Sequence, residues 1–182
     1  TFLSFDPRGN GESVATAYRR ARGYAELLKA QVQGQKNGLF IGPLGVGKTH
    51  LACSALNELR AQGIGCLFAS GNELFQALFD SFDSDEKEHI LKQATEIDVF
   101  CLDDLSQMQK REDGSYQKTT LFTIFNQRYI ARRPTIITAS DDKEWREWLH
   151  PAILSRLFGR DKVEAIGMQG RDYRMMGGHT NG

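Results

Sequence analysis

The stretch GPLGVGKT, residues 42–49, constrains the fold of this chain more than any other segment. It matches the pattern G-x-x-x-x-G-K-[ST], in which a glycine-rich turn joins a strand to a helix and wraps around phosphate groups. The apolar run NGLFIG, 37–42, predicts the strand before it, and residues 48–61 follow with helical spacing. Because both required neighbours are present, the sequence predicts a phosphate-binding loop in an α/β fold.

The residues of this loop have separate roles in phosphate binding. Gly42, Gly45 and Gly47 let the backbone turn with its N–H groups facing inward, where a Cβ would obstruct the phosphates. We expect Lys48 to reach the β- and γ-phosphates and the Thr49 hydroxyl to hold Mg²⁺. The other nucleotide-binding positions are Pro43, Leu44 and Val46. The alternative is a glycine-rich turn that binds no ligand.

Two adjacent carboxylates follow the apolar run in VFCLDDL, residues 99–105. A strand buried on both faces reads as continuous hydrophobics, so Asp103 and Asp104 lie where burial stops. In phosphate-loop folds a carboxylate at this place takes Mg²⁺, usually through water, which assigns Asp103 to the metal. Asp104 is then available to polarise an attacking water as a general base. The alternative for Asp104 is a capping role in the following turn.

Strand and helix alternate along the rest of the chain. Strands are predicted over 65–70, 98–104, 134–140 and 162–168, and helices over 13–30, 48–61, 83–96, 119–131 and 151–158, with a short helix near Trp145. Ser70 and Glu73 form a capping box of the S-x-x-E type that opens a further helix. Repeated β-α units of this length predict a parallel sheet with helices on both faces.

Bulk composition excludes several classes of function. The 23 basic and 23 acidic side chains cancel, so no overall field attracts the chain to nucleic acid or an anionic membrane. Cys53, Cys66 and Cys101 stand singly in hydrophobic segments, without the paired spacing of zinc or redox sites. No apolar stretch approaches the ~18 residues of a membrane span, and no cleavable signal opens the chain. We therefore expect a cytoplasmic protein with no membrane contact.

Four segments occur in the order, and at about the spacing, of the AAA+ ATPases: GLFIGPLGVGKTHLA, VFCLDDL, FNQRYIARRPTIITAS and ILSRLFG. More narrowly, the chain resembles the DnaC/DnaI helicase-loader and IstB transposition-helper group. The resemblance implies one AAA+ domain over 1–182 with a reduced or absent C-terminal lid and with ATP or ADP and Mg²⁺ as cofactors. It divides into an N-terminal segment and helix (1–36), a P-loop core (37–169) and a second-sensor segment with tail (170–182). A partner-binding domain N-terminal to this chain is expected.

The resemblance also assigns site residues. In this group a second Asp often replaces the catalytic Glu of other AAA+ proteins, which supports Asp104 as the catalytic acid. Arg156 in LSRL resembles the arginine finger that reaches a neighbouring subunit's ATP, and Arg174 in RDYR resembles the second-sensor arginine. The first-sensor position, commonly Asn in the group, is Ser140 here, whose hydroxyl can orient water with a shorter reach. The alternative for Arg156 is a plain surface or salt-bridge arginine, and the alternative for Arg174 is an exposed arginine in a fraying tail.

These features predict an ATPase that loads the replicative DNA helicase and self-assembles through ATP-bridged interfaces, with single-stranded DNA as a further partner. The nearest alternative is a transposition helper that presents DNA to a transposase. A P-loop kinase for a small metabolite and a nucleotide-binding scaffold without turnover also remain open.

DNA binding has the least support in the residues themselves. Phe75, Phe79 and Phe82 fall at the helical spacing that is typical of a core. The denser basic cluster Arg128, Arg132 and Arg133 suits a subunit interface as well as a DNA contact.

Overall fold

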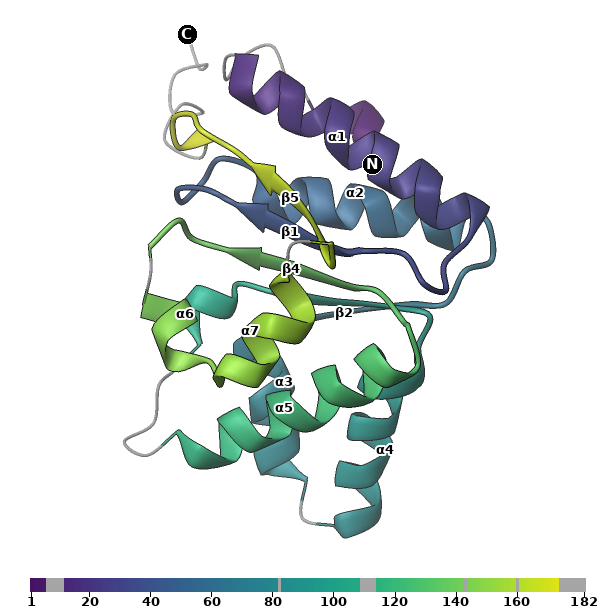
Figure 1. Ribbon diagram of the computed structural model, residues 1–182, viewed down its shortest axis with the longest axis vertical. Helices are drawn as coiled ribbons and strands as arrows, with labels where there is room; N and C mark the ends of the chain where they lie inside the picture. The colour runs from purple at the N-terminus through teal and green to yellow at the C-terminus, as the bar shows by residue number, and fades with distance from the viewer. Residues whose placement is uncertain (6–11, 82, 109–113, 143, 160, 174–182) are drawn as a thin grey trace, which may run out of the picture.

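The computed structural model describes residues 1–5, 12–81, 83–108, 114–142, 144–159 and 161–173. Five strands form a single sheet in the order β2-β3-β4-β1-β5, and all neighbouring strands are parallel (Figure 1). The strands are β1 (Asn37–Ile41), β2 (Cys66–Ser70), β3 (Val99–Asp103), β4 (Thr135–Ala139) and β5 (Val163–Gly167). The predicted α/β class with a parallel sheet is confirmed.

Helices cover both faces of the sheet, as predicted. Figure 1 shows α1 and α2 on one side of the sheet and α3 to α7 on the other. The α-helices are α1 (Glu12–Ala30), α2 (Lys48–Arg60), α3 (Gly71–Asp80), α4 (Ser84–Glu96), α5 (Ser115–Ile130), α6 (Glu144–Trp148) and α7 (Pro151–Phe158). Among the described residues, the short 3-10 turn η1 (Phe2–Ser4) precedes α1 and the turn η3 (Leu105–Gln107) follows β3. No helix in the described ranges combines the length and apolarity needed to cross a bilayer.

The strands divide their side chains between two cores because successive residues of a strand point to opposite faces. Phe40 of β1 and Cys101 of β3 pack with the helices α1 and α2. Leu39 and Phe100, their neighbours along the chain, pack instead with the five helices on the other face. Phe75 also lies in that second core, 3% exposed, so its helical spacing does mark a core residue.

The predicted capping box is present and begins α3. The Ser70 hydroxyl accepts from the backbone N–H of Glu73 at 3.2 Å, and the Glu73 carboxylate accepts from the N–H of Ser70 at 3.1 Å. The next helix, α4, has its own cap, because the Asp83 carboxylate accepts from the N–H of Asp85 at 3.1 Å. Local polar chemistry thus sets both helix starts on this side of the sheet.

Arg128 differs from the other two members of the basic cluster, because it is a core residue and not a surface cation. It is 1% exposed, whereas Arg132 is exposed and Arg133 half-buried. Its Nε donates to the Thr135 hydroxyl at 3.0 Å. The other guanidinium nitrogens donate at 2.6–3.3 Å to the carbonyls of Ala94, Thr95, Ile97, Asp98 and Pro134. Burial lowers the pKa of Arg128 to about 9, so the guanidinium stays charged at neutral pH.

We therefore expect Arg128→Met to destabilise the protein by about 3–5 kcal/mol, because it removes the hydrogen bonds that several backbone carbonyls accept from the buried guanidinium. Arg132→Met, on an exposed side chain, should change the free energy of unfolding by no more than about 0.5 kcal/mol. Urea unfolding of the two variants measures the difference. Equal losses would contradict the structural role of Arg128.

Candidate functional site

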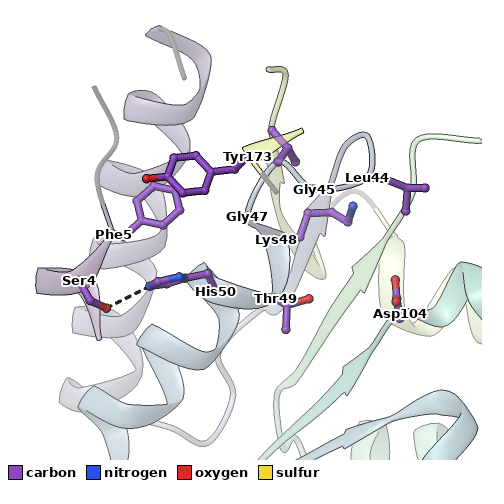
Figure 2. Close-up of a pocket in the computed structure, with 11 residues that line it drawn as sticks. Ser4, Phe5, Leu44, Gly45, Gly47, Lys48, Thr49, His50, Asp104 and Tyr173 are labelled. Carbon is purple, nitrogen blue, oxygen red and sulfur yellow. Dashed lines mark hydrogen bonds between the residues drawn. The ribbon is translucent and has the colours of Figure 1, made fainter. Parts of the chain in front are cut away.

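The phosphate loop, residues 42–49, connects β1 to α2 and forms one wall of a cavity of about 320 Å³ (Figure 2). Loop residues from Leu44 to Thr49 line it, and the N-terminus of α2 lies there, which favours anions. The remaining lining residues are Ser4, Phe5, His50, Asp104 and Tyr173.

Two loop glycines adopt backbone conformations that side chains rarely take. Gly45 has φ 69° and Gly47 has φ 100°. A Cβ on Gly45 would overlap the carboxylate of Asp172, and a Cβ on Gly47 would lie 2.8 Å from the ring of Phe5. The structure thus adds a second reason for these glycines: segments from near both ends of the chain pack directly against the loop.

Lys48 is held inside the loop. The side chain is only 6% exposed, and its ammonium donates to the carbonyls of Gly42 and Pro43, both at 2.8 Å. The only lysine or arginine among the described residues that line the cavity is therefore fixed at the loop, where phosphate oxygens could replace these carbonyls as acceptors.

The structure brings Thr49 and Asp103 together from separate elements. The Thr49 hydroxyl donates to both oxygens of the Asp103 carboxylate, at 2.9 and 3.1 Å, although Thr49 lies in the first turn of α2 and Asp103 ends β3. A hydroxyl beside a carboxylate is a donor set that suits Mg²⁺, which takes few protein ligands and completes its shell with water and phosphate oxygens. No group of three or more His, Cys, Asp or Glu residues in the described ranges could hold a metal ion. The residues present fit a magnesium site of this sparse kind.

Thr138 links the two acids, and sequence reasoning missed it. Its hydroxyl donates to Asp103 Oδ1 at 2.6 Å and accepts from the backbone N–H of Asp104 at 2.9 Å. The strand order explains the contact, because β4 lies between β1 and β3 at the edge where the phosphate loop begins. The signal available in the sequence was a threonine near the end of β4, a strand whose residues are all buried.

Asp104 lies in the left-handed region, at φ 57° and ψ 42°, which Asp tolerates better than most residues. It is the N-cap residue of η3, yet its side chain makes no capping hydrogen bond. The carboxylate instead lines the cavity, and Figure 2 shows it across from Thr49. The capping alternative is therefore wrong, and the general-base role of Asp104 stays a prediction.

The end of the cavity away from Asp104 is aromatic. The rings of Phe5 and His50 meet edge to face at 5.2 Å between centroids, and the Ser4 hydroxyl lies 3.2 Å from His50 Nε2. Tyr173 projects over the same end (Figure 2). Sequence reasoning assigned no role in the site to His50 or Phe5. The position of His50 directly after Thr49 was the one available signal.

Three predicted site residues are not among the described residues that line this cavity. Ser140 is 8% exposed, its hydroxyl donates to the Asp142 carboxylate, and it does not line the cavity. Arg156 donates to the carbonyl of Ala152 at 3.2 Å and lies at the opposite edge of the sheet. Arg174 falls outside the described residues. The roles of all three stay predictions.

A phosphate loop after β1 and two acids after β3, on a parallel sheet of this order, define a nucleotide-binding protein of the P-loop AAA+ class. The chain belongs to the family of IstB-like ATP binding proteins, whose pattern matches residues 20–177.

Curated relatives carry two kinds of name. The replicative helicase loader DnaC of Escherichia coli (strain K12) is 26% identical over 149 residues, covering 80% of this chain and 58% of that protein. A putative ATP-binding protein of insertion sequence IS5376, from Geobacillus stearothermophilus, is 28% identical over 159 residues, covering 82% and 60%. The chain thus spans about 60% of the length of the relatives it matches.

Solved structures agree with the fold. A crystal structure of DnaI has a TM-score of 0.68 at 25% identity and covers 94% of this chain and 89% of that one. A crystal structure of the DnaC helicase loader has a TM-score of 0.70 at 21% identity and covers 92% and 96%. AMPPCP-bound DnaA from Aquifex aeolicus has a TM-score of 0.72 at 22% identity, covering 91% and 49%.

The contacts of Thr138 generate a prediction. Thr138→Val removes the hydroxyl that serves both Asp103 and Asp104, so we expect a loss of about 1–3 kcal/mol in unfolding free energy and weaker Mg²⁺-dependent nucleotide binding. Thr138→Ser keeps the hydroxyl and should keep most of both properties. Urea unfolding and nucleotide titration with and without Mg²⁺ measure these effects. Indistinguishable Val and Ser variants would show that the hydroxyl does not position the acids.

Proposed function

We propose that this chain is a Mg²⁺-dependent ATPase. The observation that carries the proposal is the convergence of Lys48, Thr49, Asp103 and Asp104 on one edge of the sheet. A triphosphate along the loop would put its base toward the aromatic end at Phe5 and His50 and its terminal phosphate toward Asp104. The membership in a family of ATP binding proteins supports ATP as the nucleotide.

In this mechanism each residue has a distinct task. Lys48 and the loop N–H groups bind the phosphates, while Thr49 and Asp103 would hold Mg²⁺. When bound, Mg²⁺ neutralises charge on the β- and γ-phosphate oxygens. The Asp104 carboxylate accepts a proton from the attacking water, and Thr138, through its bonds to both acids, positions it.

We also propose that hydrolysis in the isolated chain is slow. Lys48 supplies the only Lys or Arg charge among the described residues that line the cavity. Arg156 lies at the edge of the sheet opposite the phosphate loop. It could therefore contact a nucleotide only on a neighbouring subunit. Arginine fingers supplied in this way accelerate phosphoryl transfer by about 10³–10⁵-fold. Self-assembly would then control turnover.

For the biological role we propose helicase loading, with a transposition helper as the second candidate. The relatives named replicative helicase loaders, and a structural match covering 96% of the DnaC loader chain, favour the first. The family description and the insertion-sequence relatives favour the second. Co-purification of the tagged protein with the replicative helicase of its own host, compared with a transposase encoded beside it, separates the two roles.

The phosphate cradle can be tested by nucleotide binding alone. Lys48→Ala removes the charge at the loop and should weaken binding of a fluorescent ATP analogue about tenfold or more. Lys36→Ala, at an exposed lysine on the opposite edge of the sheet, is the matched control and should bind as wild type. Equal affinities in all three proteins would rule out the assignment of the loop.

Substitutions of the two acids should have different effects on hydrolysis and on Mg²⁺-dependent binding. Asp104→Asn keeps the shape of the side chain but cannot take a proton, so turnover should fall by about 10²-fold or more while nucleotide affinity changes little. Asp103→Asn should instead weaken the dependence of binding on Mg²⁺. Unchanged turnover in Asp104→Asn, in an assembly whose wild type hydrolyses ATP, would contradict the general-base role.

A further inference from the structure

The segment after β5 lies along the phosphate loop and is held there by backbone hydrogen bonds. At its start the N–H of Met168 donates to the carbonyl of Ile41, the last residue of β1, at 2.8 Å. At its end the N–H of Tyr173 donates to the carbonyl of Gly45 at 3.0 Å. We call residues 168–173 the strap. Because the strap is bonded to the sheet and to the loop, its side chains have set positions relative to the nucleotide cavity.

The strap places a carboxylate against the phosphate loop. The carboxylate carbon and both oxygens of Asp172 are the three heavy atoms nearest to the position that a Cβ on Gly45 would take. Asp172 is half-buried and is not among the described residues that line the cavity, whereas Gly45 and Tyr173 are. The carboxylate therefore lies beside the loop, close to the phosphate site without filling it.

The proposed mechanism gives Asp172 no task. Lys48 binds phosphates, Asp103 with Thr49 suits Mg²⁺, and Asp104 lines the cavity as the candidate general base. Among the described lining residues Lys48 is the only lysine or arginine, so the cavity has little positive charge to spare. A third acid beside a loop that binds a polyanion raises the electrostatic free energy of the bound state.

We infer that Asp172 is an autoinhibitory acid, whose charge lowers the affinity of the phosphate loop for nucleoside triphosphates. The inference rests on the proposed nucleotide site and deepens it, because it names a residue that limits the occupancy of that site. A loop weakened in this way fills at a higher nucleotide concentration. The charge of the ligand sets the size of the effect, so ATP is disfavoured more than ADP.

The opposite role for Asp172 is support of the loop. A carboxylate that accepts hydrogen bonds from backbone N–H groups can hold a loop in its binding conformation. The observations favour opposition to the ligand, because the Tyr173 N–H already ties the strap to the loop and needs no side chain to do so. The two roles predict changes of opposite sign in nucleotide affinity when the charge is removed.

Substitutions that separate charge from shape test this inference in the full 182-residue chain. Asp172→Asn removes the charge and keeps the size of the side chain, whereas Asp172→Glu keeps the charge. Asp161→Asn, at an exposed acid on the opposite edge of the sheet, is the matched control for net charge. Titration with fluorescent ATP and ADP analogues in the presence of Mg²⁺, at low and high salt, measures affinity, and thermal melting verifies folding.

Asp172→Asn should bind the ATP analogue about tenfold more tightly than wild type at low salt, with a smaller gain for the ADP analogue. High salt should reduce both gains, because it screens the repulsion. Asp161→Asn should bind as wild type, and Asp172→Glu should show no gain. Damage to the fold or to the loop weakens binding, so tighter binding is a result that damage would not produce.

Unchanged or weaker ATP binding in Asp172→Asn would overturn the inference, and weaker binding would assign Asp172 to support of the loop. An equal gain in Asp172→Glu or Asp161→Asn would also overturn it, because charge beside the loop would then not be the cause. The same holds for a gain that is no larger for ATP than for ADP, or that high salt leaves unchanged.

Titration of Lys48→Ala in parallel separates this inference from the proposed function. Loss of binding in Lys48→Ala, with no gain in Asp172→Asn, would leave the nucleotide site standing and reject the role of Asp172 alone. Wild-type affinity in Lys48→Ala would reject the site and the inference together.

Discussion

The carboxylate of Asp103 is the contact on which the candidate site depends. It ends β3 and accepts hydrogen bonds from Thr49, in the first turn of α2, and from Thr138 near the end of β4. One buried anion thus joins the phosphate loop to two central strands. A buried carboxylate needs such partners, because a lone charge removed from water is strongly disfavoured. The hydrogen bonds that compensate the buried carboxylate of Asp103 therefore also hold the phosphate loop at a fixed distance from the second acid, Asp104.

The opposite end of the same strands shows the corresponding arrangement with the charge reversed. Arg128 is buried beside the starts of β3 and β4, where its guanidinium donates to the backbone carbonyls of Ile97 and Pro134. A planar group with five N–H donors can serve several carbonyls at once, which an ammonium cannot do in the same geometry. The ends of the central strands are thus held by one buried carboxylate and one buried guanidinium.

The features that could be predicted from the sequence are those that depend on residues close together in the chain. The Ser70–Glu73 box, the strand positions and the phosphate loop depend on neighbours within a few residues, and all three are present. The start of α5 was placed four residues late because its N-cap is Gly114, in the left-handed conformation and without a side-chain cap. No polar capping signal exists there to be found.

Contacts between distant segments were beyond the same reasoning. Thr138 lies beside Asp103 because of the order of the strands in the sheet. Phe5 lies against Gly47 although the two residues are far apart in the sequence. Arg128 looked like a member of a surface cluster, because its sequence neighbours Arg132 and Arg133 carry the same charge. Burial depends on which helix face meets the sheet, and a short basic run does not specify that.

Two segments that are distant in the sequence pack on the phosphate loop, one from before it and one from well after it. Phe5 lies against Gly47, and Asp172 lies against Gly45, while the N–H of Tyr173 donates to the Gly45 carbonyl at 3.0 Å. Any change in loop conformation on binding a nucleotide must therefore move these segments or be resisted by them. Ligand affinity and the position of the flanking segments are then thermodynamically coupled, since a ligand shifts an equilibrium only by its differential affinity for the two states.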